Sequence, residues 1–381
     1  MKSAKLKGVS FLASPPNSAL STPELLAALE KIWGYDHFRP HQEEAVRAAL
    51  EGRDCLVVMP TGAGKSLTFQ LPAALSEGVS VVISPLIALM RDQVLALREK
   101  TAFSEIGVAF LNSSQSAEEQ RDILTLLRAG KLKLLYIAPE RLRSNGFIKT
   151  LQNAKLARIV VDEAHCISEW GHDFRPDYLA IADVLNALGD VQKFAVTATA
   201  TTRVQRSIVE NLRMREPEII VGGFNRPNLH FSVVKCKNDL ERENKLFKAL
   251  PKLAARGGSG LVYVSTRKQC ESVAELCAKA LAPLGLRAGC YHAGMDGALR
   301  SRMQELWLCG EIPVLVATNA FGMGIDKSDV RFVIHWGFPE SPESYYQEAG
   351  RAGRDGRKSR VTILSCSVAD RKLREFFITN E

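Results

Sequence analysis

Short apolar runs alternate along this chain with longer segments in which apolar residues recur every three or four positions. The first pattern is typical of buried strands in a parallel sheet, and the second of amphipathic helices. In the first half, strands are predicted at residues 55–59, 79–84, 134–138, 159–162 and 193–196. After a break at Gly222 and Gly223 the alternation restarts, with strands predicted at residues 260–265, 287–291, 314–317, 330–335 and 361–365. The sequence therefore predicts an α/β fold with two parallel sheets.

The predicted organisation is a flexible N-terminal tail over residues 1–23, a first lobe over residues 24–222 and a second lobe over residues 223–381. The tail is rich in serine and has no acidic residue, and the segment STPE at residues 21–24 is a plausible helix start. Ligands of open parallel sheets bind at the carboxyl ends of the strands, so two such sheets side by side predict a cleft between those ends. Chemically active residues are expected in that cleft.

Composition narrows the class of protein. With 46% hydrophobic and 24% charged residues, the 381-residue chain is expected to be a soluble globular protein without a membrane-spanning helix. Its net charge of +8 favours a polyanionic partner. A protein whose surface charge serves only to keep it soluble could have the same net charge. The 8 cysteines form no C-x-x-C pair, so we expect reduced core thiols, no zinc and a cytoplasmic protein, or a nuclear one in a eukaryote.

The strongest chemical signal is the segment MPTGAGKS at residues 59–66, between a predicted strand and a predicted helix at residues 67–75. It resembles a P-loop in the shorter T-G-x-G-K-S form. Glycines let backbone N–H groups converge on phosphate oxygens, a lysine neutralises β/γ charge, and a serine can ligate Mg²⁺. The expected phosphate-binding residues are Thr61, Gly62, Ala63, Gly64, Lys65 and Ser66, with Ser66 also on the metal.

Two carboxylates, Asp162 and Glu163, end the strand predicted at residues 159–162. Alone, two acids at a strand end are more often simply solvated. Together with a P-loop they predict hydrolysis, in which Asp162 holds Mg²⁺ while Glu163 orients and deprotonates the attacking water.

Three residues upstream of the P-loop are candidates for base recognition. The amide of Gln42 can form two hydrogen bonds with an adenine edge, and Tyr35 or Arg39 can stack on the ring. The residues alone leave open the simpler interpretation of a surface glutamine beside an aromatic core neighbour.

In the second half, Gln347, Arg351 and Arg354 are four and three residues apart, which predicts that one helical face carries all three. Gly350 and Gly353 would each cost a helix interior about 1 kcal/mol, which favours a close backbone approach, with phosphate as a natural candidate. If the cleft closes, the arginines could reach the γ-phosphate and contribute roughly 10³- to 10⁵-fold in rate. The alternative is a solvated basic helix.

Taken together, these segments resemble the RecQ family of superfamily-two DNA helicases, nearly continuously from Trp33 to about Phe377. The matching segments are FRPHQ at 38–42 (the adenine-reading motif zero), DEAH at 162–165, TAT at 197–199 (motif III), AFGMGID at 320–326 (motif V) and 347–354 (motif VI). The resemblance implies two tandem RecA-like lobes. It also implies an ATP- and Mg²⁺-dependent helicase that moves 3′-to-5′ on single-stranded DNA in recombination and repair.

The segment directly after the DEAH box resembles the aromatic-rich loop that distinguishes this family. Trp170 and Phe174 offer stacking faces, and His172 and Arg175 offer donors or cations. Stacking one base is worth about 1 to 3 kcal/mol, enough to help trap an opened strand. Without the resemblance, Trp170 and Phe174 could equally be core residues.

The resemblance assigns further roles. Implied DNA contacts, in addition to those of the aromatic-rich loop, are Pro85, Leu86, Arg91, Gln93, Arg141, Ser265, Arg267 and Thr318. Residues implied to couple hydrolysis to strand movement are His165, Thr197, Thr199 and Asp326. Such contacts, mostly to phosphate, give salt-dependent affinity with little sequence preference.

The chain departs from the family at a few positions. Trp33, Ala63 and Asp326 stand where Phe, Gly and Asn are more usual, and only Cys366 follows motif VI, where relatives commonly have a four-cysteine zinc module and a winged helix. We therefore expect a monomeric helicase core without these modules, acting on single-stranded and forked DNA. Three alternatives remain: an ATP-switched nucleic-acid binding or annealing module without productive unwinding, an RNA helicase, and a nucleotide kinase, which would not need Arg351 and Arg354.

Overall fold

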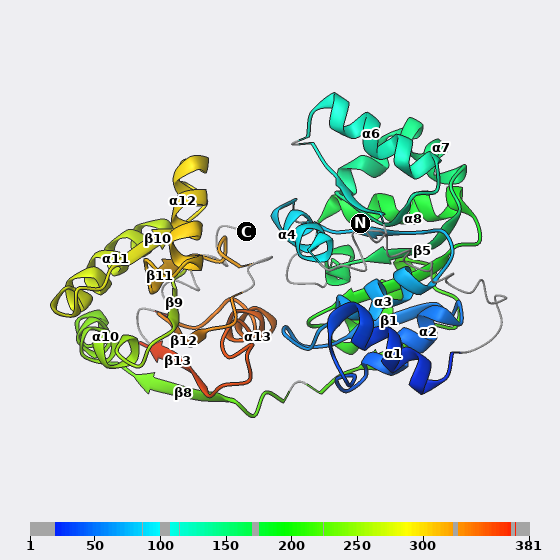
Figure 1. Ribbon diagram of the computed structural model, residues 1–381. Coiled ribbons are helices and arrows are strands. Elements are labelled where there is room, and N and C mark those ends of the chain that lie inside the picture. Colours follow the sequence, from blue (N-terminus) through cyan, green and yellow to red (C-terminus); the bar gives the residue numbers. More distant parts are fainter. Residues whose placement is uncertain are drawn as a thin grey trace, which may run out of the picture.

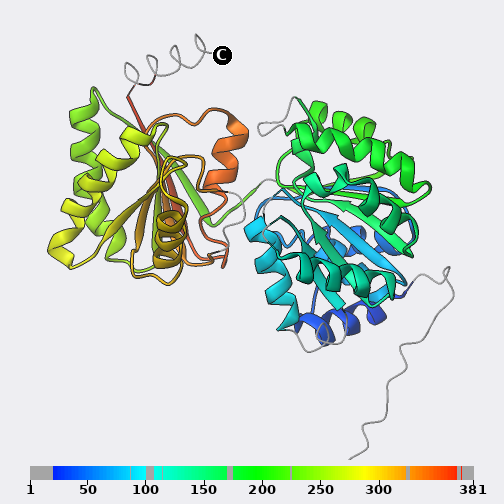
Figure 2. The same cartoon turned by 90° about the horizontal axis from the view of Figure 1, so that it is seen from above.

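A computed structural model describes residues 20–366 and Asp370, apart from the gaps at Leu86, 100–106, Ser114, 170–174, Phe224, 323–326 and 367–369. Two α/β lobes lie beside each other, and the chain passes between them along one side of the molecule (Figure 1). Seen from above, helices cover both faces of each sheet (Figure 2). The predicted class, two parallel sheets in tandem lobes, is confirmed.

The first lobe is built on a seven-stranded sheet with the order β3-β4-β2-β5-β6-β1-β7, in which all neighbours are parallel. Its strands are β1 (Cys55–Val58), β2 (Val79–Ile83), β3 (Gly107–Leu111), β4 (Leu132–Ile137), β5 (Leu156–Val161), β6 (Gln192–Thr197) and β7 (Glu218–Val221). Its α-helices are α1 (Thr22–Trp33), α2 (Gln42–Leu50), α3 (Leu67–Leu75), α4 (Ile87–Arg98), α6 (Ala117–Arg128), α7 (Asn145–Gln152), α8 (Pro176–Leu188) and α9 (Thr202–Asn211), and two 3₁₀ turns are η1 (Pro139–Arg143) and η2 (Ala164–Ile167).

Strand β1 shows how the sheet is buried on both sides. Leu56 and Val58 belong to the apolar cluster on one face, while Cys55 and Val57 belong to the cluster on the other. Side chains alternate along a strand, so a sheet covered on both faces needs apolar residues at every position. This arrangement fixes β1 rigidly and places the loop that follows it at the carboxyl edge of the sheet.

The second lobe is built on a six-stranded, wholly parallel sheet with the order β10-β11-β9-β12-β13-β8. Its strands are β8 (Leu229–Lys235), β9 (Ser259–Tyr263), β10 (Ala288–Tyr291), β11 (Val314–Ala317), β12 (Val330–His335) and β13 (Ser359–Ser365). Its helices are α10 (Asp239–Ala254), α11 (Arg267–Leu281), η3 (Ala282–Leu284), α12 (Gly297–Leu308) and α13 (Pro342–Ala349).

Each predicted strand overlaps an observed one, but the sequence did not predict β3, β7 and β8. All three are edge strands, which are buried less completely. In β8, for example, Phe231 and Val233 are exposed, so the strand lacks the continuous apolar run used to recognise the others. Such edges give a weaker hydrophobic pattern.

The first sheet ends at Val221 and the second begins at Leu229, so the predicted lobe boundary at 222/223 falls in the connection between them. Residues 1–19 of the predicted tail lie outside the described residues. Helix α1 begins at Thr22, and Ser21 and Glu24 form a capping box at its start. No helix within the described ranges is long and apolar enough to cross a membrane.

Candidate nucleotide site between the two lobes

The P-loop, residues 59–66, follows β1 and leads into α3, as predicted. Gly62 and Gly64 have φ of +84° and +82°, a left-handed backbone that glycine adopts without steric cost. A Cβ on Gly64 would lie 2.4 Å from Nε2 of Gln42, so a larger residue there would displace the Gln42 amide from its position against the P-loop. The backbone N–H groups ahead of α3 are therefore arranged in a curve suited to phosphate.

Lys65 lies inside the P-loop and close to the carboxylates. Its Nζ donates to the carbonyl of Met59 at 3.0 Å. Burial lowers the pKa of Lys65, and the nearby charge of Arg354 adds to this, while Glu163 and Asp162 oppose it. The charges that act on Lys65 are therefore those of Asp162 and Glu163 in the first lobe and Arg354 in the second.

Gln42 and Arg39 close the P-loop from the side of α2. Nε2 of Gln42 donates to the carbonyls of Ala63 (3.2 Å) and Gly64 (3.0 Å), and its Oε1 accepts from the backbone N–H of Arg39 (2.8 Å). Nη1 of Arg39 donates to the carbonyl of Gly62. Tyr35 nearby in the sequence is exposed. Adenine recognition by these residues stays a prediction, and the structure adds that Gln42 and Arg39 hold the P-loop backbone.

Asp162 and Glu163 follow β5 at the same edge of the sheet. Asp162 is held by its backbone N–H, which donates to the carbonyl of Ile83 (2.9 Å), and its Oδ1 accepts from the N–H of Glu163 (3.0 Å). Burial, together with repulsion from Glu163, raises the pKa of Asp162 to about 7, against the attraction of Lys65. Glu163 has a left-handed backbone, with φ of +47°, and among the described residues its buried Oε2 accepts no hydrogen bond.

His165 connects the DEAH segment to the end of β6. Its Nδ1 lies 2.9 Å from the hydroxyl of Thr197, and that hydroxyl donates to the carbonyl of Thr199 at 3.1 Å. The hydroxyl has a single hydrogen, so Nδ1 of His165 must be the donor to Thr197. Three of the four predicted coupling residues thus form one chain of hydrogen bonds, while Asp326 lies outside the described residues.

The prediction that Gln347, Arg351 and Arg354 share a helical face is wrong. Helix α13 ends at Ala349, so only Gln347 lies on it. The arginines belong to residues 350–357, which we call the arginine loop. Gly353 has φ of +61°, and its N–H donates to the carbonyl of Val330 (2.9 Å) instead of continuing the helix.

Within the arginine loop, close backbone approach does occur, but to protein. A Cβ on Gly350 would lie 3.4 Å from Cβ of Thr61, and one on Gly353 would lie 2.4 Å from Nδ2 of Asn228. A Cβ on Gly62 would lie 3.6 Å from Cγ of Arg354. The arginine loop of the second lobe therefore packs directly against the P-loop of the first.

Arg351 points elsewhere, into a cavity of about 140 Å³ within the second lobe. Arg351 is buried, and its guanidinium packs against Gly322. Burial raises the pKa of Tyr263 to about 12, and the charge of Arg351 opposes this rise, which places the two side chains together. Other residues lining the cavity are Ser265, Asn319, His335, Gln347 and Glu348.

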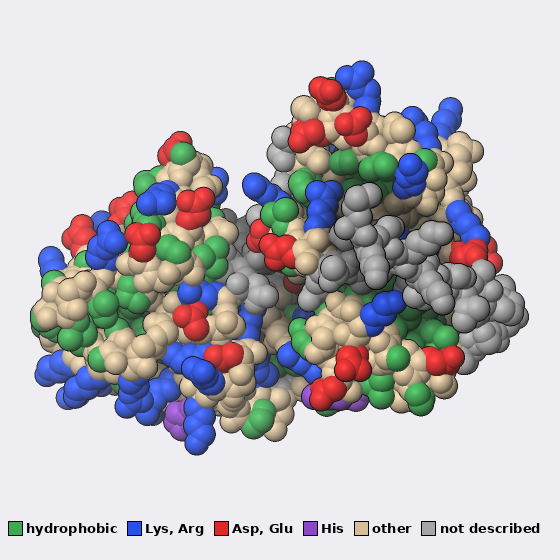
Figure 3. All heavy atoms as spheres, in the orientation of Figure 1, with side chains coloured by type: hydrophobic (Ala, Val, Ile, Leu, Met, Phe, Trp, Pro, Cys, Tyr) green, Lys and Arg blue, Asp and Glu red, His purple; other side chains and the backbone are tan. Residues whose placement is uncertain are grey.

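The predicted DNA-contacting residues differ in exposure. Arg91, Ser265 and Arg267 are exposed, whereas Thr318 is buried and its hydroxyl accepts from the N–H of Ala320 (3.4 Å). On the face drawn in Figure 3, Lys and Arg side chains also gather along the lower edge of the second lobe, near α10 and β8. The DNA roles of Arg91, Ser265, Arg267 and Thr318 stay predictions, and none was predicted for the side chains near α10 and β8.

Several predicted DNA contacts also have partners within the protein. Nη1 of Arg141 donates to Gln120 (3.1 Å), Oε1 of Gln93 accepts from Gln70 (2.9 Å), and the carbonyl of Pro85 accepts from Nη1 of Arg175 (3.3 Å). Leu86, Trp170, His172 and Phe174 lie outside the described residues.

Sequence reasoning missed three residues of the site. Ser84 donates to Oδ2 of Asp162 (3.4 Å), and the hydroxyl of Tyr178 donates to the carbonyl of Asp162 (3.0 Å). Ser84 follows β2 at the carboxyl edge of the sheet, a position that could have identified it. The third, Arg226, has backbone carbonyls as partners, for which the sequence holds no local signal.

Possible metal ligands and cysteines are the remaining groups to compare with the predicted site. Within the described ranges no three His, Cys, Asp or Glu side chains are grouped as a metal site. The cysteines are free thiols, mostly buried, with Cys309 exposed.

Comparison with protein families matches both lobes. The model described as DEAD/DEAH box helicase matches residues 39–207, and the model described as helicase conserved C-terminal domain matches residues 242–356. The first range contains the P-loop and both carboxylates, and the second contains most of the arginine loop.

Among curated proteins, the chain is 44% identical over 345 residues to the ATP-dependent DNA helicase RecQ of Haemophilus influenzae, covering 91% of this chain and 54% of the relative. It is 45% identical to the protein of the same name from Bacillus subtilis, covering 88% of this chain and 55% of the relative. The chain thus spans about half the length of these relatives.

Among solved structures, the helicase MrfA bound to DNA matches with a TM-score of 0.75 and 20% identity, over 93% of this chain and 53% of that one. Saccharomyces cerevisiae Dbp5 bound to RNA and ADP BeF3 matches with a TM-score of 0.69 and 19% identity, over 93% of this chain and 90% of that one. At such identities the likeness establishes the two-lobed fold alone.

Proposed function

The chain belongs to the RecQ family of DNA helicases, and we propose that it is the ATP- and Mg²⁺-dependent core of such an enzyme, moving 3′-to-5′ on single-stranded DNA and separating duplex DNA. The main support is the packing of the arginine loop against the P-loop, with Arg354 beside Gly62. A nucleotide site completed by a second lobe can respond to hydrolysis by moving that lobe. The 3′-to-5′ direction and the role in recombination and repair rest on the family.

ATP binding is assigned to the P-loop. The backbone N–H groups near Gly62 and Gly64 would receive phosphate oxygens at the N-terminus of α3, where the helix dipole favours negative charge. Lys65 would exchange its bond with the Met59 carbonyl for the β- and γ-phosphates. Gln42 and Arg39, which already hold the loop backbone, would recognise adenine with Tyr35.

Ser66 and Asp162 would hold Mg²⁺. Their donor atoms are a hydroxyl and a carboxylate, the oxygen ligands that this ion prefers. The Asp162 carboxyl is half-buried, and burial and Glu163 raise its pKa, so a cation held by Ser66 and Asp162 would offset the cost of its negative charge. When bound there with ATP, the ion would supply positive charge that offsets the negative charge of the phosphates. We expect no zinc in this chain.

Glu163 would act as the general base. Its backbone is left-handed, and its buried Oε2 accepts no hydrogen bond among the described residues, although Nδ1 of His165 lies 3.5 Å away. Such an oxygen is able to accept the proton of an attacking water. Arg354, already against the P-loop, would stabilise charge on the γ-phosphate, and Arg351 and Gln347 would follow if lobe movement turns them toward it.

Coupling to DNA would run through His165, Thr197 and Thr199. Their hydrogen bonds join the end of β5, where Glu163 lies, to the end of β6. The exposed Arg91, Ser265 and Arg267 are candidates for contacts to DNA phosphates at the carboxyl edges of the two sheets. The aromatic-rich loop, 166–176, would sense the strand, and forked DNA would be the substrate for unwinding.

A fork-unwinding assay with ATP, alongside ATPase measured with single-stranded DNA, tests the proposal. The expected result is ATP-dependent strand separation by a monomer. Binding and hydrolysis without separation would instead indicate an ATP-switched annealing module. Equal stimulation by RNA and DNA would indicate an RNA helicase.

A further inference from the structure

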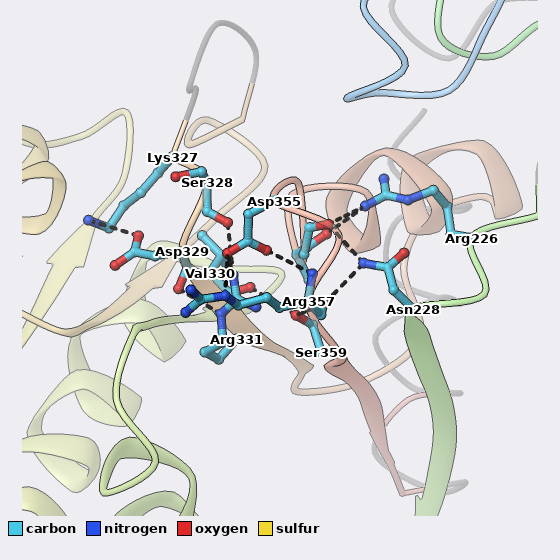
Figure 4. Close-up of polar contacts among 12 residues, drawn as sticks. Arg226, Asn228, Lys327, Ser328, Asp329, Val330, Arg331, Asp355, Arg357 and Ser359 are labelled. Carbon is cyan, nitrogen blue, oxygen red and sulfur yellow. Dashed lines mark hydrogen bonds and ion pairs between the residues drawn. The ribbon is translucent and has the colours of Figure 1, made fainter. Parts of the chain in front are cut away.

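An arginine in the connection between the lobes contacts both sides of the nucleotide site. Arg226 lies between β7 and β8. Its Nη1 donates to the carbonyl of Thr61 in the P-loop, at 2.9 Å. Its Nη2 donates to the carbonyls of Ala352 (3.0 Å) and Gly353 (2.9 Å) in the arginine loop (Figure 4). One guanidinium therefore joins backbone atoms of the two lobes.

The arginine loop is fixed by a second group of contacts drawn in Figure 4. Nδ2 of Asn228 donates to the carbonyls of Gly353 (2.8 Å) and Arg357 (3.1 Å). Arg331 donates to Oδ2 of Asp355 at 2.7 Å. The residues on either side of Arg354 are thus both held, so the position of its backbone is determined by Arg226, Asn228 and Arg331.

The contacts of Arg226 divide unequally between the lobes. Two of its three acceptors lie in the second lobe, together with Asn228 two residues further along the chain, so Arg226 moves with that lobe. Its bond to Thr61 is the one that crosses to the first lobe. Separation of the lobes would break that bond and leave the other two intact.

Arginine is suited to this place for a chemical reason. Its guanidinium presents five N–H donors in a rigid plane, whereas a lysine ammonium is a compact point donor on a flexible stem. The three carbonyls that accept from Nη1 and Nη2 of Arg226 suit the fixed directions of the N–H groups in the guanidinium plane. A lysine would keep the charge at this position but could not hold all three acceptors in fixed directions.

We propose that Arg226 is a positioning residue that fastens the P-loop to the arginine loop and so stabilises the closed arrangement of the lobes in which Arg354 faces the nucleotide. This inference rests on the proposed function, because closure matters only if ATP turnover uses both lobes. Arg226 itself need not touch ATP, since the role proposed here uses only its three hydrogen bonds to backbone carbonyls.

The test compares the parent with Arg226→Lys, and uses Arg215→Lys as a matched control. Arg215 is exposed and pairs with Asp190 on the surface of the first lobe. For Arg226→Lys we expect kcat for DNA-stimulated ATP hydrolysis to fall roughly 10- to 100-fold, as for a misplaced catalytic group. The Kd of a fluorescent ADP analogue and the Tm should stay near the parent values, and the control should resemble the parent throughout.

Energy transfer between dyes measures closure without turnover. One dye is placed on Cys309, which is exposed in the second lobe, and the other on a cysteine introduced by Glu118→Cys in α6 of the first. A non-hydrolysable ATP analogue should raise transfer in the parent and raise it less in Arg226→Lys.

The outcomes separate this inference from the proposed function. A parent without DNA-stimulated ATPase would contradict the function, while energy transfer would still decide the role of Arg226. Parent-like kcat and parent-like closure in Arg226→Lys would overturn the inference. A joint fall of kcat, ADP affinity and Tm would also overturn it, because that pattern marks a structural role.

Discussion

The imidazole of His165 donates a hydrogen bond from Nδ1 to the hydroxyl of Thr197, 2.9 Å away. That hydroxyl in turn donates a hydrogen bond to the carbonyl of Thr199. His165 lies 3.5 Å from Oε2 of Glu163, measured from the same Nδ1. The side chain assigned as general base therefore lies beside a chain of hydrogen bonds that ends at Thr199, just beyond β6. A movement at the end of β6 can change the position of His165 and, through it, the surroundings of Glu163.

Replacement Thr197→Val should weaken coupling. Valine has nearly the same shape but removes the acceptor of His165, which costs about 1–3 kcal/mol of folding free energy at a buried site. We expect lower stability in urea and fewer base pairs unwound per ATP hydrolysed, with nucleotide affinity preserved.

Thr199→Val is the matched control for Thr197→Val. Thr199 takes part through its backbone carbonyl, and its buried hydroxyl has no hydrogen-bond partner among the described residues. This variant should keep the stability and the coupling of the parent. If the two valine variants lose coupling equally, the hydrogen-bond chain is not the route.

Asp162→Asn should stabilise the protein free of Mg²⁺ at about pH 8, and the effect should be smaller at about pH 5 and absent below about pH 4. Burial and Glu163 raise the pKa of Asp162 to about 7, so the folded state holds its proton more tightly than the unfolded state. The favourable contribution of the protonated form is full only below pH 3.8, the ordinary pKa of the carboxyl, and is lost as the pH rises from there through about 7. Asparagine removes the carboxylate that ionises there.

Thermal unfolding in EDTA at the two pH values checks this prediction. Asp190→Asn, at an exposed ion pair with Arg215, should change the Tm little at either pH. A Tm of Asp162→Asn below that of the parent at high pH would show that the ionised carboxylate stabilises the fold.

Gln42→Glu should weaken nucleotide binding through the P-loop. The carboxylate can still accept from the N–H of Arg39, but it would face the carbonyls of Ala63 and Gly64, to which the amide now donates. Loss of a buried hydrogen-bond partner costs about 1–3 kcal/mol. If this cost falls on the nucleotide-binding form of the P-loop, the Kd of ADP should rise roughly 5- to 150-fold.

Gln205→Glu is the control for Gln42→Glu. Gln205 also donates to a backbone carbonyl, that of Ala200 (2.9 Å), but lies on α9 outside the P-loop. It should lower stability without changing the Kd of ADP. An unchanged Kd in Gln42→Glu would mean that the P-loop does not depend on Gln42.

The parts of the site that the sequence predicted well lie in contiguous segments. The P-loop and Asp162–Glu163 each follow a buried strand, and the strand pattern places both at the carboxyl edge of one sheet. Local chemistry and local structure coincide there, so residue type and spacing were sufficient.

The errors have physical reasons too. Spacing of four and three residues implies a shared face only in a helix, and the arginine loop leaves the helix because Gly353 adopts a positive φ and bonds to Val330. Arg226 could not be found because its partners are backbone carbonyls at Thr61, Ala352 and Gly353, which carry no residue-specific signal. Edge strand β8 lacked a continuous apolar run.

Trp170→Ala should bind ATP normally and lose DNA-stimulated turnover. The expectation comes from the stacking capacity of the aromatic-rich loop, at about 1–3 kcal/mol for each base. Fluorescent ADP binding and ATPase with increasing single-stranded DNA measure the two properties separately. Stimulation equal to that of the parent would assign Trp170 to the core.

The steady-state ATPase rate of the parent and of Lys65→Ala, with and without single-stranded DNA, tests the central claim most directly. Lys155→Ala, at an exposed ion pair with Glu77, is the control. The account predicts that DNA raises the rate of the parent and of the control, and that Lys65→Ala loses roughly 10²- to 10³-fold with DNA present. Equal rates for the parent and Lys65→Ala would contradict it.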